Sequence, residues 1–192
     1  LYALVPIALI MLQPDFGSAM VIVGLWLGMA LVSGISKRHI LIVLGALVVV
    51  FSISWLFLFK PYQKARIVSF IHPTSDIRGS GYNAYQSVIA VGSGGAIGKG
   101  LGYGTQSRLN FLPEYQTDFV FAAFSEEWGF FGSLLILCCF CFLLWRLKVH
   151  AARGASNFET LFCVGYMIFL FGHIVVNIGM NIGIMPVTGI PL

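Results

Sequence analysis

Long apolar runs separated by short polar segments define the organisation of this chain. All but the first reach at least about 17 residues, the length that an α-helix needs to cross the hydrocarbon core of a membrane. The pattern predicts membrane spans at about residues 1–12, 16–32, 40–59, 118–145 and 158–179. We therefore expect an all-α polytopic membrane protein, with residues 1–192 forming one partial transmembrane domain. Because both ends lie in or beside apolar segments, we expect a fragment of a longer protein.

Composition agrees with a membrane protein and excludes other classes. Only 9% of the residues are charged and the mean hydropathy is +0.92, whereas a soluble domain carries about 25% charged residues. The basic residues cluster in loops and form no stacking platform with aromatic residues, which argues against nucleic-acid binding. Cys138, Cys139, Cys141 and Cys163 lack the spacing of metal ligands, and we interpret them as small packing residues.

Two short basic loops predict the orientation in the membrane. Lys37 and Arg38 form one cluster, and residues 146–153 carry the other. The positive-inside rule places both in the cytoplasm. The intervening region, 60–117, is then extracytoplasmic, provided that it does not cross the membrane. Its one helical candidate, Tyr82–Ile97, is amphipathic and too short to cross, so we expect an interfacial or re-entrant helix.

The extracytoplasmic loop carries an excess of positive charge. Its basic residues are Lys60, Lys64, Arg66, Arg78, Lys99 and Arg108. The acidic residues that offset their charge are only Asp76 and Glu114 within the loop and Asp118 directly after it. Because Arg and Lys are the usual partners of phosphate, the excess indicates an anionic headgroup or pyrophosphate at the outer surface. For any single one of these basic residues, the alternative to binding a specific anionic ligand is nonspecific contact with lipid headgroups.

Acidic residues at the membrane edge are the candidates for chemistry. Asp118 lies where a loop enters the fourth predicted span, with Ala122 and Ser125 on the same helical face. It is either a general base or part of a helix start capped by Thr117. Asp15, after Pro14, is a second candidate that is equally compatible with a helix cap.

Other polar residues inside the predicted spans have simpler interpretations. Glu126 and Glu127 lie about two turns into the fourth span, where we expect a structural bridge to Arg or Lys. Asn177 and Asn181 are expected to make interhelical hydrogen bonds. His173 is interpreted as a packed polar residue, and neither a Ser-His-Asp pattern nor a metal motif is present.

Several motifs, taken together, resemble the SEDS family of shape, elongation, division and sporulation proteins of the RodA and FtsW type. They are Gln13–Gly17, Gly81–Ser87, Gly104–Glu114, Thr117–Phe119 with Glu126–Gly129, Asn177–Met180 and Gly183–Gly189. The match covers nearly the whole chain in order, and the sequences of Gly104–Ser107 and Pro186–Pro191 are closer to RodA. The chain resembles the part of the family fold from the end of the fifth helix to just past the ninth.

The resemblance implies an inverting peptidoglycan glycosyltransferase that polymerises lipid II at the outer face of the bacterial cytoplasmic membrane. It implies Asp118 as the catalytic base and Asp15 as a polar residue of the central cavity. Lys64, Arg66, Lys99 and Arg108 become candidates to hold the pyrophosphate, with a divalent cation as a further candidate for that task. Gln86, Ser107 and Glu114 complete the predicted substrate-binding set.

The resemblance also implies a partner, a single-pass class B penicillin-binding transpeptidase. This chain differs from the family at Tyr115 and Gln116, where family members often have His or a basic residue. An effect of a basic neighbour on the acidity of Asp118 is therefore not expected in this protein.

Two other functions compete with the glycosyltransferase. A flippase or transporter of the lipid-linked precursor would need polar residues at mid-bilayer, whereas most charges here lie at the rims of the spans. A non-catalytic membrane scaffold would leave the loop acids and the basic excess without a purpose.

Overall fold

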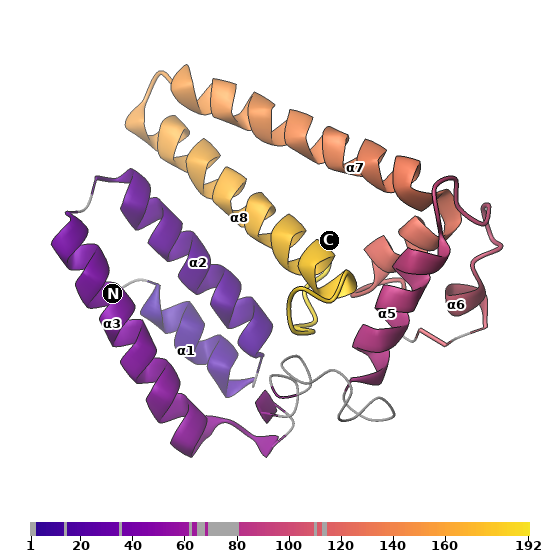
Figure 1. Ribbon diagram of the computed structural model, residues 1–192. Coiled ribbons are helices and arrows are strands. Elements are labelled where there is room, and N and C mark those ends of the chain that lie inside the picture. Colours follow the sequence, from indigo (N-terminus) through magenta and orange to yellow (C-terminus); the bar gives the residue numbers. More distant parts are fainter. Residues whose placement is uncertain are drawn as a thin grey trace.

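The computed structural model (Figure 1) describes residues 3–13, 15–34, 36–61, 63–64, 68, 81–109, 111–112 and 115–192. Within these residues every regular element is helical, as predicted. The helices are α1 (Leu4–Leu12), α2 (Phe16–Val32), α3 (Lys37–Ile53), the π-helical turn η1 (Ser54–Leu58), α5 (Tyr82–Ser93), α6 (Thr105–Arg108), α7 (Val120–Ala152) and α8 (Asn157–Asn181).

Helix α8 is the centre of the arrangement. It pairs with α7 along one side and with α2 along the other, and α1 packs against α2. Small residues allow α2 and α8 to approach closely, because a Cβ at Gly28 would lie 2.9 Å from Ile168 and one at Gly165 would lie 3.3 Å from Met29. Helix α5 lies against the start of α7, on the right in Figure 1.

Membrane-spanning capacity follows from length and composition. Three described helices are long and apolar enough to cross a membrane, at Arg38–Phe57, Val120–Ala152 and Asn157–Asn181, and a shorter apolar helix covers Gly17–Val32. Lys37 and Arg38 lie at the start of α3, and Arg146 and Lys148 lie near the end of α7, so the two basic clusters are largely helical and adjoin the α2–α3 and α7–α8 loops. The two loops lie at the same end of the helices in Figure 1. Their cytoplasmic placement stays a prediction, as do the predicted spans and the extracytoplasmic position of residues 60–117.

Helix α7 is interrupted at Gly129. Its 33 residues would extend about 50 Å as one straight helix, more than the roughly 30 Å of a hydrocarbon core. Gly129 has φ 68° and ψ −163°, a region that only glycine adopts readily. The break separates a short first segment, Val120–Trp128, from the long apolar segment that begins at Phe130.

Breaking a helix frees backbone groups that must find new partners. In an unbroken helix the amides of Phe130 and Phe131 would donate to the carbonyls of Glu126 and Glu127. Here they donate to Gly95 O (2.8 Å) and Ala96 O (3.2 Å), while Lys99 N and Gly100 N donate to Glu126 O and Glu127 O (both 3.0 Å). We call these four hydrogen bonds the backbone clasp.

The backbone clasp also ends α5 earlier than predicted. The pattern predicts a helix to Ile97, but α5 stops at Ser93. Gly95 and Gly98 adopt positive φ, and a Cβ at Gly98 would overlap the Glu127 carbonyl. The glycines therefore bring the loop after α5 against the interrupted helix.

Candidate functional site

Asp118 lies immediately before α7, two residues ahead of Val120 and next to the N-cap position at Phe119. The predicted N-cap, Thr117, is therefore wrong. The Asp118 side chain is half-buried, and one carboxylate oxygen lies against Gly189, where a Cβ would be 3.5 Å away. Beneath it, Phe119, Ala122, Leu112 and Ala90 form a buried apolar cluster.

Two buried amides fix the backbone of Asp118. Asn177 and Asn181 are 0% exposed, and their Nδ2 atoms donate to the Asp118 carbonyl at 2.9 and 3.2 Å. Asn181 Oδ1 accepts from the amide of Ala122 at 3.1 Å. These bonds join α8 to the start of α7, which confirms the expected interhelical role and holds the acid in one place.

The C-terminal segment, residues 184–192, joins the Asp118 motif to the Asp15 motif. Asn177 Nδ2 also donates to Ile190 O at 2.9 Å. A Cβ on Gly17 would lie 2.6 Å from Thr188 O and 3.3 Å from Ile190, so the start of α2 touches the same segment. Two motifs that are about 100 residues apart in the sequence therefore meet around Gly189.

Asp15 is the N-cap of α2. Its carboxylate accepts from Ser18 N at 3.1 Å and also from Ser18 Oγ. The residue is exposed, and a carboxylate at this position is favoured by the helix dipole. The capping interpretation is thus confirmed, and the predicted role in substrate binding stays a prediction.

His173 is packed against the same segment. Its Nδ1 lies 3.1 Å from Pro191 O, and its ring centroid lies 4.3 Å from that of Phe169. The ring is thus held between α8 and the C-terminal segment.

Lys99 forms an ion pair with the buried carboxylate of Glu126. Lys99 Nζ lies 2.7 Å from Glu126 Oε1, with side-chain exposures of 29% and 0%. The expected bridge from Glu126 to Arg or Lys is confirmed. Lys99, which is predicted as a pyrophosphate ligand, therefore already has a carboxylate partner, and its role in substrate binding stays a prediction.

The other predicted substrate-binding residues are spread over the outer region. Arg108 is exposed at the end of α6, Gln86 is half-buried on α5, and Ser107 lies within α6. Lys64 Nζ lies 5.6 Å from the centroid of the Trp55 ring, a cation–π distance. Arg66 and Glu114 lie outside the described residues. Ser107 and Arg108 follow Thr105 and Gln106, which donate hydrogen bonds to Glu126 of α7.

Metal ligation has no support among the described residues, where no three His, Cys, Asp or Glu side chains gather closely enough to hold an ion. We therefore derive no step through the divalent cation named above.

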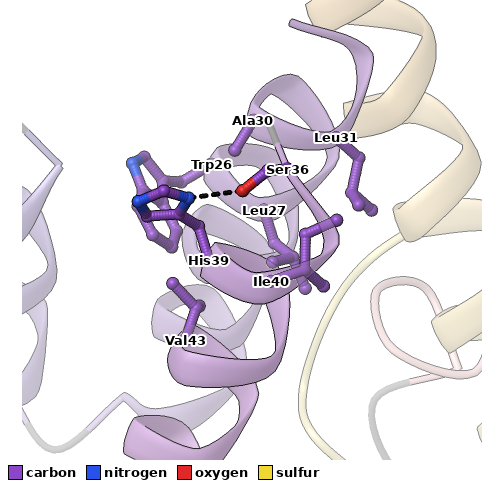
Figure 2. A pocket seen from close by; sticks show the side chains of 8 residues that line it. All are labelled: Trp26, Leu27, Ala30, Leu31, Ser36, His39, Ile40 and Val43. Carbon is purple, nitrogen blue, oxygen red and sulfur yellow. Dashed lines mark hydrogen bonds between the residues drawn. The ribbon is translucent and has the colours of Figure 1, made fainter. Parts of the chain in front are cut away.

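A cavity of about 440 Å³ lies between α2 and α3, at the far end of α2 from Asp15. Figure 2 shows its apolar lining, with Ser36 Oγ and His39 Nδ1 joined at 2.6 Å. Its position separates it from the acidic site.

Sequence reasoning missed two features of the site. It did not connect Gly189 with Asp118, since only the folded chain brings the C-terminal segment beside α7. It also did not predict the interruption of α7, although a glycine directly after Glu126, Glu127 and Trp128 in an apolar run is a recognisable signal for one.

Comparisons with known proteins place this geometry in a family. Residues 1–192 match the model of the FtsW/RodA/SpoVE family of cell cycle proteins. Peptidoglycan glycosyltransferase MrdB of Escherichia coli K12 is 42% identical over 97% of this chain and 50% of its own length. Stage V sporulation protein E of Bacillus subtilis is 42% identical over 96% of this chain and 50% of its own.

A probable peptidoglycan glycosyltransferase FtsW of Thiomicrospira cyclica is 36% identical over 96% of this chain and 47% of its own. The chain spans about half the length of the curated relatives it matches. A chain of a solved peptidoglycan synthase complex matches with a TM-score of 0.79 and 32% identity, over 99% of this chain and 52% of that one. The protein is therefore an all-α, multi-pass membrane protein, and the chain belongs to the FtsW/RodA/SpoVE family, as its motifs predicted.

Proposed function

We propose that the full-length protein is a peptidoglycan glycosyltransferase that polymerises lipid II at the outer face of the bacterial cytoplasmic membrane. The observation that carries the proposal is the placement of Asp118. Its backbone is held by Asn177 and Asn181 while its carboxylate lies half-buried beside Gly189. Relatives named as peptidoglycan glycosyltransferases at 36–42% identity support the same activity.

In the proposed reaction Asp118 is the general base. A hydroxyl of the acceptor sugar attacks the anomeric carbon of the donor, forming the new C–O bond. The hydroxyl proton passes to a carboxylate oxygen of Asp118. The bond from the anomeric carbon to the pyrophosphate oxygen breaks, and polyprenyl pyrophosphate leaves with the electron pair. One base acting on the side opposite to the leaving group gives inversion, as in inverting glycosidases.

The leaving group needs positive charge. Arg108 is the described candidate with an exposed guanidinium, and guanidinium groups bind phosphate in a bidentate manner. Lys64 and Arg66 are further candidates, and Gln86, Ser107, Glu114 and Asp15 remain candidates for the sugars and peptide.

The polyprenyl tail would lie in apolar space along α2 and α8. One cavity of about 430 Å³ is lined by residues such as Met29 and Phe162, and another of about 350 Å³ reaches Ser18, His173 and Pro191. Both include Phe169, so they adjoin along the helices. The second cavity ends next to the segment that touches Asp118, which supports a tail in the helices and a headgroup at the site.

The proposal includes a partner, a class B penicillin-binding transpeptidase that cross-links the new strands. The likeness to a chain of a peptidoglycan synthase complex supports it. Whether the role is in elongation or in division does not enter the chemistry proposed here.

The test is polymerisation of lipid II by the purified full-length protein, supplied with its transpeptidase partner. The wild type is expected to form glycan strands, and Asp118→Ala is expected to form them at least about 100-fold more slowly, because a general base contributes about 10²–10⁴-fold. Strands formed equally by the variant would exclude Asp118 as the base. Movement of lipid II across liposomes without polymer, unchanged in the variant, would favour the flippase instead.

A further inference from the structure

Glu126 is bound more completely than an ion pair requires. Its Oε1 accepts from Lys99 Nζ at 2.7 Å and from the amide and hydroxyl of Thr105 at 2.9 Å each. The amide of Gln106 donates to both oxygens, at 3.2 and 3.1 Å. A carboxylate offers about four acceptor sites, so these bonds nearly fill its capacity. The side chain is 0% exposed.

These bonds attach one exposed segment to α7. Thr105 and Gln106 begin α6, and α6 ends at Arg108. After Arg108 the chain returns, because Leu112 N donates to Gln106 O at 3.1 Å and its side chain packs with Phe119 in the buried cluster. The segment is therefore attached to Val120–Trp128 at both ends, and Arg108 lies between the attachments on the surface.

The same α7 segment also begins directly after Asp118. Glu126 and Asp118 are eight residues apart, or about two helical turns. A rigid helical segment thus carries the proposed base at one end and the anchor of the Arg108 segment at the other. The backbone clasp at Gly129 secures its far end.

The ammonium of Lys99 contacts this anchor, although the residue itself is exposed. Its ammonium contacts Glu126 Oε1 at 2.7 Å and Thr105 Oγ1 at 2.9 Å, so two of its three donors are already bound inside the protein. Removing one member of a buried ion pair leaves an uncompensated charge, whereas removing both is much less harmful. This difference makes the role of Lys99 measurable.

We propose that Glu126 and Lys99 are positioning residues that hold α6 so that Arg108 meets the pyrophosphate of the lipid-linked donor. Lys99 serves as the counter-ion of Glu126 and does not itself bind the phosphate. The inference rests on the proposed glycosyltransferase function for its kinetic consequence. Its structural consequence, the attachment of α6, is independent of that function.

The experiment uses the full-length protein with its transpeptidase in lipid nanodiscs. The variants are Glu126→Gln, Lys99→Met and the double variant, with Lys99→Arg as the conservative change. Glu127→Gln is the matched control, since it makes the same chemical change at the neighbouring position of α7. Two quantities are measured: kcat and KM for lipid II, and the rate at which trypsin cleaves after Arg108.

Glu126→Gln and Lys99→Met are each expected to raise KM at least tenfold, to change kcat less than threefold and to speed the cleavage at least fivefold. Lys99→Arg and Glu127→Gln are expected to match the wild type within threefold. The double variant is expected to recover at least threefold in KM over Glu126→Gln, because both charges are gone.

Two results would overturn the inference. If the losses in KM multiply in the double variant, Lys99 contacts the substrate by itself. If Lys99→Met raises KM while cleavage after Arg108 stays at the wild-type rate, Lys99 is a ligand and not a positioning residue, and this comparison stands even where Glu126→Gln fails to fold. A wild-type protein that forms no polymer would reject the glycosyltransferase, while the cleavage rates would still decide whether the pair holds α6.

Discussion

Replacing Gly129 by alanine tests the backbone clasp. Gly129 has φ 68° and ψ −163°, and a non-glycine residue held in such a region costs about 1–3 kcal/mol. A Cβ there would also overlap the amide nitrogen of Gly98 and the carbonyl carbons of Ile97 and Ala96. These are backbone atoms, so the whole loop from Gly95 to Gly100 must move away.

The magnitude follows from the bonds that the movement would break. The clasp consists of four backbone hydrogen bonds of 2.8–3.2 Å, and each buried group left without a partner costs about 1–3 kcal/mol. Losing one bond in addition to the backbone strain gives about 2–6 kcal/mol. At roughly 1–2 °C per kcal/mol for a protein of the full length, the melting temperature of Gly129→Ala should fall by at least about 2 °C.

The assay is thermal unfolding of the full-length protein in detergent at one heating rate, because unfolding of such proteins is commonly irreversible. Gly172→Ala is the control, since Gly172 lies within α8 and a Cβ there meets nothing within 4 Å. The control should melt at or slightly above the wild-type temperature. If Gly129→Ala melted within 1 °C of Gly172→Ala, the interruption of α7 would not need glycine and the clasp would be wrong.

Two further predictions concern the residues around the acid. Asn181→Ala should lower the free energy of unfolding by about 1–3 kcal/mol, because the buried amide of Ala122 loses its acceptor. The control Asn157→Ala, at the exposed start of α8, should have little effect. Equal melting temperatures for the two variants would contradict the role of Asn181. Asp15→Asn should keep the stability of α2, since Asn caps as well as Asp, yet should weaken lipid II binding if the carboxylate contacts the substrate. Unchanged binding, measured by lipid II titration, would leave Asp15 as a cap alone.

Much of the helical framework could be predicted because it depends on local patterns. The predicted span 16–32 coincides with α2, since an apolar run begins directly after the capping Asp15. Helix α8 begins where Ser156 accepts from Glu159 N and Ala155 N donates to the Glu159 carboxylate, a local signal of a helix start. Such boundaries need only neighbouring residues.

The rest depends on distant partners. Helix α7 continues to Ala152, beyond the predicted end at 145, and residues 146–152 are helical although several are charged. The interruption at Gly129 depends on residues 95–100, some 30 positions earlier. The expected bridge of Glu126 to a basic residue is confirmed, but the sequence could not show that Lys99 is that residue, because the two are 27 positions apart.

The site itself was predicted as a set of motifs and not as an arrangement. Asp118 was selected for its place at a membrane edge, and the structure adds that Asn177 and Asn181 hold its backbone. The contact with Gly189 has no local signal, because it arises from the return of the chain after α8.

In the proposed reaction Asp118 takes a proton and does not merely bind substrate. The measurement that tests it most directly compares lipid II affinity and polymerisation rate in full-length wild type and Asp118→Asn. Because asparagine has nearly the same shape but cannot accept the proton, binding should stay within about threefold while polymerisation falls at least about 100-fold. An Asp118→Asn protein that polymerises at the wild-type rate, or one that loses activity only in proportion to its lost affinity, would contradict the account.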